Sequence, residues 1–252
     1  MGNELKLEHF VLDKVGLDLY IPNQPYFKPN TITAFVANSI EIPNGAIVIE
    51  QGAGIGPISI LLAKKYPNLS HMYSVEKKEY QFRALKRNIE HYNLEDKLTP
   101  QLGDLFKPIP YNLKADIIFS DASGMSEYWG RNMETNGESW YPKGIETGGE
   151  DGAEVLCNFI AQSIHHLKQN GEVYFTIVPN FSDTKRIIET ARKNYKQVEP
   201  FKQKEIGLTT EQRQTIDAAA NKLYQDIEKR GSRGTWICEI WKATNPINNP
   251  HQ

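Results

Sequence analysis

The 252-residue chain carries 29 Lys and Arg residues against 31 Asp and Glu, so its formal net charge is −2 at neutral pH. Hydrophobic residues make up 39% of the sequence and charged residues 24%, which is typical of a folded globular domain and argues against disorder. This balance gives no basic excess that would indicate a nucleic-acid partner. The sequence shows no signal peptide and no apolar run near the roughly 18 residues that span a membrane, so we expect a cytoplasmic protein.

Apolar runs alternate with longer amphipathic segments along the chain, a pattern typical of successive β-α-β units. In chain order, the predicted strands are residues 46–49, 71–75, 98–102, 116–120, 172–178, 197–206 and 235–242. The predicted helices are residues 58–65, 79–92, 154–167, 184–194 and 209–229. We therefore predict a Rossmann-like α/β fold, with a seven-stranded, mostly parallel sheet and helices on both faces.

We expect a single domain over residues 1–252, because no linker-like segment divides the chain. Residues 1–40 precede the first predicted strand and are expected to cover the cofactor and substrate. Residues 207–234 are predicted to be a helical insertion before the last strand. The two cysteines and the adjacent His165 and His166 show no metal-ligand spacing, so we predict no metal site.

The first predicted strand ends in Glu50, and a glycine turn, Gly52-Ala53-Gly54-Ile55-Gly56, leads into the next helix. Glycine is required where the backbone has a positive φ or where a ligand approaches the main chain closely. The G-x-G-x-G spacing differs from the G-x-G-x-x-G fingerprint of dinucleotide-binding proteins, which weakens the case for a pyrophosphate ligand. A tight turn that binds no ligand is the alternative.

Glu76 ends the second predicted strand, where a carboxylate can accept hydrogen bonds from both hydroxyl groups of a ribose. Asp104 follows the third strand and can accept from an adenine amino group, with Leu105 or Phe106 against the ring. An acidic residue at position 50 suits a cationic ligand better than a phosphate. These features favour S-adenosylmethionine (SAM) over NAD, although Gly103-Asp104 is also an ordinary turn sequence.

Residues 47–106 together resemble the cofactor half of class I SAM-dependent methyltransferases. The resemblance implies that SAM is the methyl donor and S-adenosylhomocysteine (SAH) the product. More narrowly, the chain resembles the branch of release-factor glutamine-N5 and N6-adenine methyltransferases over roughly residues 20–180. Tyr26-Phe27-Lys28-Pro29 looks like an upstream motif of that branch, which implies that Phe27 lines the methionine end of SAM; a Pro-rich entry loop is the alternative. Residues 140–152 end in the branch's Gly-Gly-Glu-Asp-Gly sequence.

The chain departs from this branch just after the fourth predicted strand. Where the branch has Asn-Pro-Pro-Tyr, this sequence has Asp121-Ala122-Ser123-Gly124. We therefore do not transfer glutamine or adenine as the substrate. Asp121 could orient an amine or hydroxyl group and take its proton as a general base. Alternatively, it caps the following turn or contacts the cofactor, and we count it among the cofactor-binding residues as well.

The residues after Asp121 are candidates for substrate binding. We expect Ser123, Tyr128, Trp129 and Trp140 to line a substrate pocket, with packing against the core as the alternative. The acidic residues Glu146, Glu150 and Asp151 favour a cationic or amine-bearing substrate if they face that pocket.

The prediction for function is a SAM-dependent methyltransferase that acts on an N or O nucleophile of a small molecule or peptide, with nucleic acid unlikely and no membrane association. One alternative is methylation of a protein side chain or an RNA base. Another is an inactive SAM-binding interaction protein, suggested by the loss of the Asn-Pro-Pro-Tyr sequence. The sequence identifies neither the acceptor nor the oligomeric state.

Overall fold

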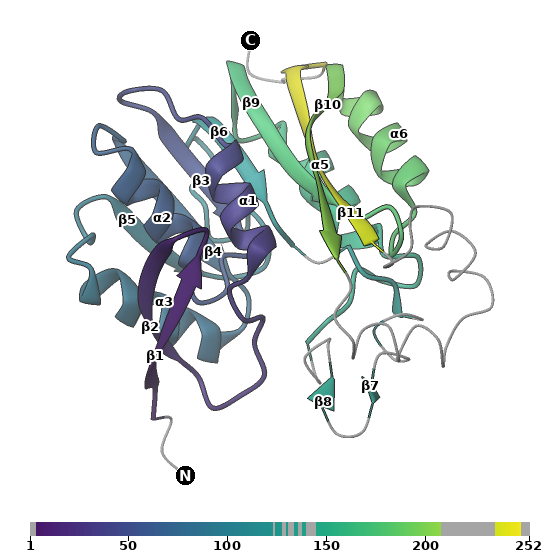
Figure 1. The fold of residues 1–252 in the computed structure, drawn as a ribbon. Coiled ribbons are helices and arrows are strands. Elements are labelled where there is room, and N and C mark those ends of the chain that lie inside the picture. The colour runs from purple at the N-terminus through teal and green to yellow at the C-terminus, as the bar shows by residue number, and fades with distance from the viewer. Residues whose placement is uncertain are drawn as a thin grey trace.

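The computed structural model describes residues 4–122, 124–127, 130, 134–135, 138–139, 145–207 and 235–247. Its main feature is a seven-stranded sheet with helices on both sides (Figure 1). The strands are β1 (Lys6–Leu12), β2 (Val15–Ile21), β3 (Ile47–Gln51), β4 (His71–Glu76), β5 (Leu98–Leu102), β6 (Ala115–Ser120), β7 (Glu134–Thr135), β8 (Glu138–Ser139), β9 (Leu167–Ile177), β10 (Tyr195–Gly207) and β11 (Thr235–Pro246). The helices are α1 (Thr31–Ser39), α2 (Pro57–Lys65), α3 (Glu79–His91), α5 (Glu154–Ser163) and α6 (Thr184–Asn194).

The strand order of the main sheet is β10-β11-β9-β6-β3-β4-β5. Strands β9, β6, β3, β4 and β5 are parallel, whereas β11 is antiparallel to both β9 and β10. The chain passes from β3 outward to β4 and β5 and then returns to the other side of β3 to form β6. Ligands of such sheets bind beyond the carboxyl ends of the strands at this reversal, which here lies between β3 and β6. The predicted Rossmann-like α/β fold is confirmed.

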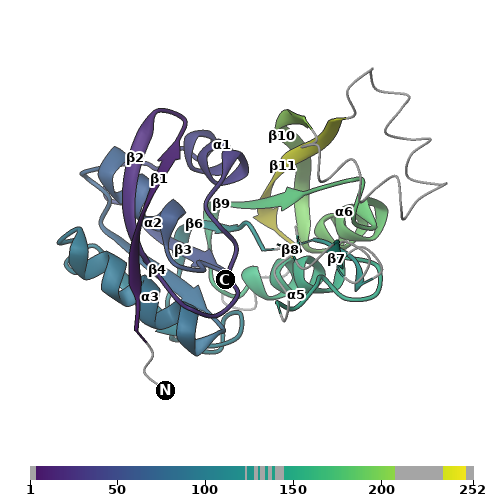
Figure 2. The same cartoon turned by 60° about the horizontal axis from the view of Figure 1, so that its bottom comes forward.

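Two hydrophobic core clusters cover the two faces of the sheet. One includes Val48, Met72 and Phe119 of the sheet and packs against residues of α1, α2 and α3. The other includes Ile49 and Ile118 and packs against residues of α5 and α6. Figure 2 shows α1 and α6 on opposite sides of the sheet. Because neighbouring residues of a strand point to opposite faces, this assignment also fixes the direction of the polar side chains at the strand ends.

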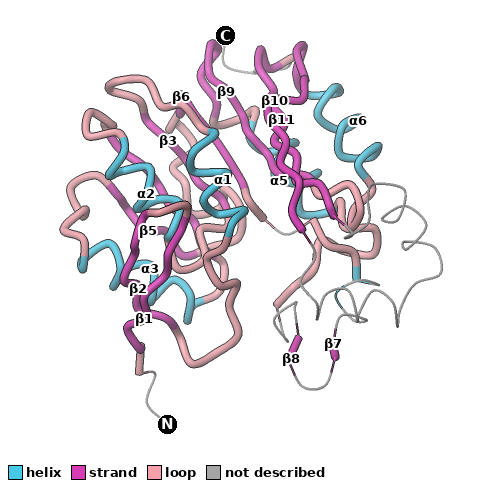
Figure 3. The backbone as a smooth tube through the Cα atoms, viewed as in Figure 1, coloured by secondary structure: helices cyan, strands magenta, loops and turns pink. Residues whose placement is uncertain are grey.

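Strands β1 and β2 form a hairpin that the sequence predictions did not include. Its two-residue turn consists of Asp13 and Lys14, both with positive φ, which is the conformation of a tight hairpin turn. The hairpin is attached to α3 through the buried Asn88, whose amide bonds both the N–H and the C=O of Tyr20 and also the C=O of Ile55 in the glycine turn. Residues 22–30 then run from β2 to α1 as a loop (Figure 3). The N-terminal segment therefore packs directly on the elements that carry the glycine turn.

Several predicted boundaries shift in the structure. The predicted helix 154–167 ends at Ser163, because residues 164–166 form a turn and Leu167 already pairs with Ala115 in the sheet. The predicted helix 209–229 lies outside the described residues. Among the described helices, none is both long and apolar enough to cross a membrane.

Candidate active site

The glycine turn lies at the carboxyl end of β3, next to the reversal of strand order. Gly52, Gly54 and Gly56 have φ values of 75°, 58° and 90°. Gly56 is also constrained by packing, because a Cβ atom there would lie 2.5 Å from Leu85 Cδ1 of α3. The N–H groups of Gly52 and Ala53 bond the C=O of Val75, at 3.0 and 2.9 Å, which ties the turn to β4. Main-chain atoms are therefore presented at the point where the fold binds ligands.

Glu76 lies at the end of β4, and its carboxylate is held by two backbone N–H groups. Gly54 donates to one oxygen and Lys78 to the other, both at 2.8 Å. The side chain is buried, and burial raises its pKa, whereas the hydrogen bonds from Lys78 and Gly54 oppose the rise. Each carboxylate oxygen retains a second lone pair, so the group can still accept two ribose hydroxyls.

Glu50 is 2% exposed and accepts a hydrogen bond from Ser59 of α2. The Ser59 hydroxyl is also 2.8 Å from the hydroxyl of Ser74 in β4. Burial raises the pKa of Glu50 to about 8; the Ser59 hydrogen bond lowers it, while the carboxyl groups of Asp121 and Glu76 raise it further. A buried acid without a cation nearby holds its proton, and a cationic ligand would favour its ionised form.

Asp121 follows β6 directly, and the hydroxyl of Thr176 in β9 lies near enough to its carboxylate to affect its pKa. Burial raises the pKa of Asp121 to about 7, and the Thr176 hydroxyl opposes the rise. Ser120 fixes the backbone here, since its hydroxyl donates to the C=O of Gln51 and accepts from the N–H of Ala122, both at 3.1 Å. A carboxyl group with this pKa can accept a proton near neutral pH.

These side chains form one row along the strand ends. Each acidic residue lies an even number of positions after a residue of the core cluster under α1, α2 and α3. Glu50 follows Val48 by two positions, Glu76 follows Met72 by four, and Asp121 follows Phe119 by two. The alternation of strand side chains therefore directs Glu76, Glu50 and Asp121 to the same face. Their mutual effects on the pKa of Glu50 agree with this proximity. Sequence reasoning did not predict Ser59, Ser74 or Thr176, although polar residues inside apolar strands were a signal for the last two.

The residues expected to hold adenine are divided between the surface and the core. Asp104 is partly exposed and pairs with Lys107 at 3.0 Å and with Lys77 at 3.9 Å. Leu105 is half-buried, with a φ of 51°. Phe106 is stacked on His166 inside the second core cluster, with ring centroids 4.9 Å apart, so it does not face this site. Of the two ring partners expected, only Leu105 stays a candidate.

Phe27 lies in the loop between β2 and α1 and is 43% exposed, whereas its neighbour Tyr26 is buried. Of the predicted substrate residues, Ser123, Tyr128, Trp129 and Trp140 lie outside the described residues.

The Gly-Gly-Glu-Asp-Gly sequence forms a turn that contacts two loops. Gly148 donates to the C=O of Met125 at 2.7 Å, and Glu127 donates to the C=O of Gly149 at 2.9 Å. Glu146 is paired with Lys77 and Lys78, and Asp151 with Arg186. These pairs oppose the expectation that the acidic residues here are available to a cationic substrate.

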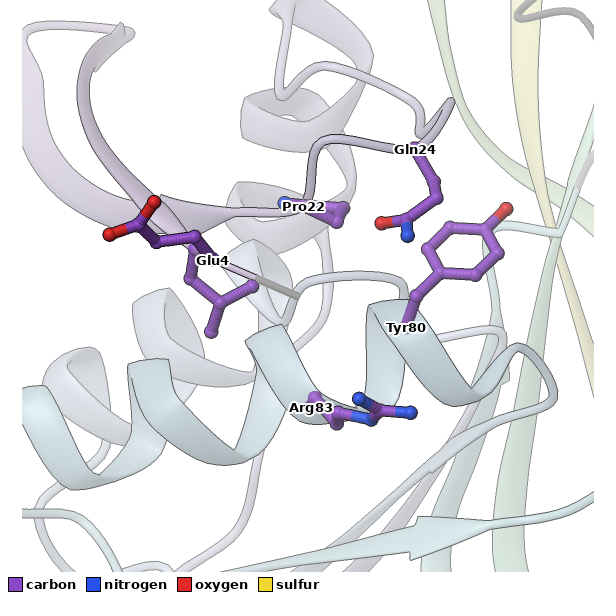
Figure 4. Close-up of a pocket in the computed structure, with 6 residues that line it drawn as sticks. Glu4, Pro22, Gln24, Tyr80 and Arg83 are labelled. Carbon is purple, nitrogen blue, oxygen red and sulfur yellow. The ribbon is translucent and has the colours of Figure 1, made fainter. Parts of the chain in front are cut away.

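The site fits a nucleoside cofactor with a cationic tail. In the part of the chain that the structure describes, buried polar atoms without a hydrogen-bond partner include Gln51 Nε2, whose residue precedes Gly52, and Tyr26 Oη, in the loop between β2 and α1. A small pocket lies between that loop and α3, lined by Glu4, Leu5, Pro22, Gln24, Tyr80 and Arg83. In Figure 4 the side-chain amide of Gln24 lies beside the ring of Tyr80, four residues after Glu76. The described residues contain no cluster of three or more metal-ligating side chains.

Comparison with known proteins identifies the same class. Residues 24–135 match the model of the TRM5/TYW2 methyltransferase domain. The release factor glutamine methyltransferase of Rhodopirellula baltica is 23% identical over 155 residues, 62% of this chain and 52% of the relative. The M. jannaschii tRNA m1G37 methyltransferase superposes with a TM-score of 0.56 at 15% identity, covering 97% of this chain and 59% of that one. P. horikoshii TYW2 in complex with MeSAdo gives 0.57 at 15% identity, covering 96% and 72%.

The fold and these matches confirm the class predicted from the sequence, a class I SAM-dependent methyltransferase resembling the release-factor branch. The chain spans about half the length of the curated relatives it matches.

The predicted partners are wrong. We expected a small-molecule or peptide substrate and considered nucleic acid unlikely. The curated relatives are instead named for macromolecular substrates, a release factor and ribosomal protein uL3, and the M. jannaschii structure is that of a tRNA methyltransferase. Overall charge misled the prediction, because a near-neutral total excludes neither a local basic surface nor a protein substrate.

Proposed function

We propose that this chain transfers the methyl group of SAM to a nitrogen atom of a macromolecular substrate, with a protein side chain as the first candidate. The row of Glu76, Glu50 and Asp121 beside the glycine turn carries this proposal, because it combines a ribose acceptor, a buried acid suited to a cation and a base on one face. A protein substrate is supported by the relatives, which are release factor and uL3 glutamine methyltransferases.

Each residue of the row has a distinct role in this proposal. SAM supplies an electrophilic methyl group, so the protein has mainly to align the acceptor and remove a proton. Glu76 binds the ribose, and the buried Glu50 lowers the energy of the cationic tail. The Asp121 carboxylate accepts an N–H of the acceptor and takes its proton, while the Thr176 hydroxyl holds the carboxylate in place.

An RNA base is the second candidate acceptor. The matched part of the TRM5/TYW2 domain runs through residue 135, so it includes both the glycine turn and Asp121. A carboxylate can accept a hydrogen bond from a base N–H as readily as from a side-chain N–H.

The two candidates are separated by incubating the protein and a cell lysate with SAM labelled in its methyl group, then separating protein from RNA. Label in protein supports the first candidate, and label confined to RNA supports the second. Absence of label from both fractions, with SAH binding intact, would contradict methyl transfer to a macromolecule and favour an inactive SAM-binding protein.

Asp121→Asn provides the matched control for this experiment. We expect labelling to fall by about 100-fold, which is within the range that a general base contributes. SAH affinity should change little, because Glu76 and the glycine turn are intact. Full labelling by this variant would show that Asp121 is not the base.

A further inference from the structure

One segment, residues 145–152, contacts loops at the ends of three different strands. Its glycine turn is packed between the loop after β6 and the loop after β9. A Cβ atom on Gly152 would lie 2.4 Å from the C=O oxygen of Gly124 and 2.8 Å from that of Phe181. Ser126 also donates to the C=O of Phe181 at 3.0 Å. The segment therefore supports the acceptor side of the site, where Asp121 begins the loop after β6.

The same segment reaches the cofactor side through Glu146. Its two carboxylate oxygens pair with the side chains of Lys77 and Lys78, at 2.7 and 2.8 Å. Figure 1 shows α3, which follows these lysines, and α5, which follows the segment, on different parts of the molecule. Lys77 and Lys78 lie 69 and 68 positions before Glu146, so the ion pairs join regions that are far apart in the sequence.

Lys78 contacts both the proposed ribose acceptor and Glu146. Its backbone N–H donates to the Glu76 carboxylate, and its side chain pairs with Glu146. A ligand that fixes Glu76 would therefore also fix the turn that carries Lys77 and Lys78. Two residues after Glu146 along the chain, Gly148 donates a hydrogen bond to the C=O of Met125, four residues after Asp121. A continuous network of direct contacts can carry coupling between two sites, and only measured coupling establishes it.

We propose that Glu146 couples the two sides of the site, so that occupancy of the cofactor side orders the acceptor loop at residues 124–127. The identity of the ligand rests on the proposed function. The effect is expected to be modest, since about half the side-chain surface of both Lys77 and Glu146 is exposed. Exposed ion pairs change equilibria by about twofold to fivefold and weaken in salt. Such a link would ensure that the acceptor loop is ordered only when the cofactor is bound.

The test is hydrogen–deuterium exchange of the full chain with and without saturating SAH. In the wild type, SAH should protect residues 52–56 and 76–78 and, in addition, residues 124–127 and 145–152. In Glu146→Gln, the first two segments should remain protected, whereas the added protection of the last two should be lost. Glu79→Gln is the matched control, because it removes an exposed ion pair, with Arg83, on the same side of the site. It should behave like the wild type.

Two further measurements test the same coupling without the Glu146→Gln variant. Lys77→Gln combined with Lys78→Gln should reproduce the loss, and about 0.5 M NaCl should weaken the added protection in the wild type itself. Equal protection of residues 124–127 by SAH in the wild type and in Glu146→Gln would overturn the coupling. Absence of protection at residues 52–56 in the wild type would instead contradict the cofactor site, and with it the proposed function.

Discussion

The cofactor side and the acceptor side of this site are built differently. On the cofactor side, Glu50, the glycine turn and Glu76 come from consecutive β-α units and are joined by hydrogen bonds between neighbouring strands. On the acceptor side, Asp121, Thr176 and the turn at residues 148–152 come from separate stretches of the chain and meet only after folding.

The two sides also differ in how closely they resemble the related branch. The cofactor side keeps the features of the class, and the family match covers it completely. The acceptor side keeps the Gly-Gly-Glu-Asp-Gly turn but has Asp121-Ala122 where the related branch has Asn-Pro. The chain thus resembles the branch in this turn, whereas it differs from the branch at the position of the proposed acceptor-binding residue.

The largest expected effect compares a glycine from each side. Gly152→Ala on the acceptor side should lower the free energy of unfolding by about 3 kcal/mol or more, because the new methyl group would meet backbone oxygens that cannot move away. Gly56→Ala on the cofactor side should cost less, since it meets the flexible end of Leu85. Urea denaturation measures both. Gly45→Ala is the control, with a φ of 74° and open space around it, and should cost only about 1 kcal/mol. Equal costs at all three positions would show that packing around Gly152 is not rigid.

The second effect tests the buried acid of the cofactor side. The pKa of Glu50 is about 8 in the folded protein, above its ordinary value of 4.5, so the folded state binds more protons between these two pH values. The contribution of Glu50 to stability should therefore be greatest at low pH and fall by about 3 kcal/mol as pH rises from 5 to 8. In Glu50→Gln the fall in stability should be clearly smaller, although Asp121 contributes in the same direction. Urea denaturation at several pH values measures the slope, and identical slopes for the two proteins would exclude an acid with a raised pKa at this position.

The third effect separates ligand binding from folding. Glu76→Gln should weaken SAH binding by about 30-fold, because it replaces a charged acceptor of two hydroxyl groups by a neutral one. Isothermal titration calorimetry measures the affinity. Asp121→Asn leaves Glu76 and the glycine turn intact, so this variant should bind SAH nearly as well as the wild type does. Affinity of Glu76→Gln within threefold of the wild type would place the ribose elsewhere.

The smallest effect concerns Thr176 on the acceptor side. Thr176→Val keeps the shape of the side chain but removes the hydroxyl that favours the ionised form of Asp121. The pKa of Asp121 should rise above 7 by about one unit. Thr176→Ser should restore the wild-type value. A carboxyl ¹³C NMR titration reads this directly, and an unchanged pKa in Thr176→Val would mean that Thr176 does not position Asp121.

How far sequence reasoning reached depended on the range of the interactions involved. All seven strands of the main sheet were predicted, most clearly where the strand is an apolar run, as in β3 and β6. The positive φ of Gly52, Gly54 and Gly56 was expected for the same local reason. The β1–β2 hairpin was not predicted, although its alternating pattern and the Asp13-Lys14 turn were present. Either Leu105 or Phe106 was predicted to lie against the adenine ring, and only the tertiary structure showed that Phe106 packs on His166 in the core.

The sequence by itself determined the α/β class, the glycine turn and the order of the acidic residues at the strand ends, because these depend on local periodicity and on turn chemistry. Only the tertiary structure decided that Glu50 is bound to Ser59, that Thr176 reaches Asp121, and that Glu146 pairs with Lys77 and Lys78. Each of these contacts joins residues on different elements, and the last joins residues nearly seventy positions apart. Such contacts depend on the order and register of the sheet, which no local pattern encodes.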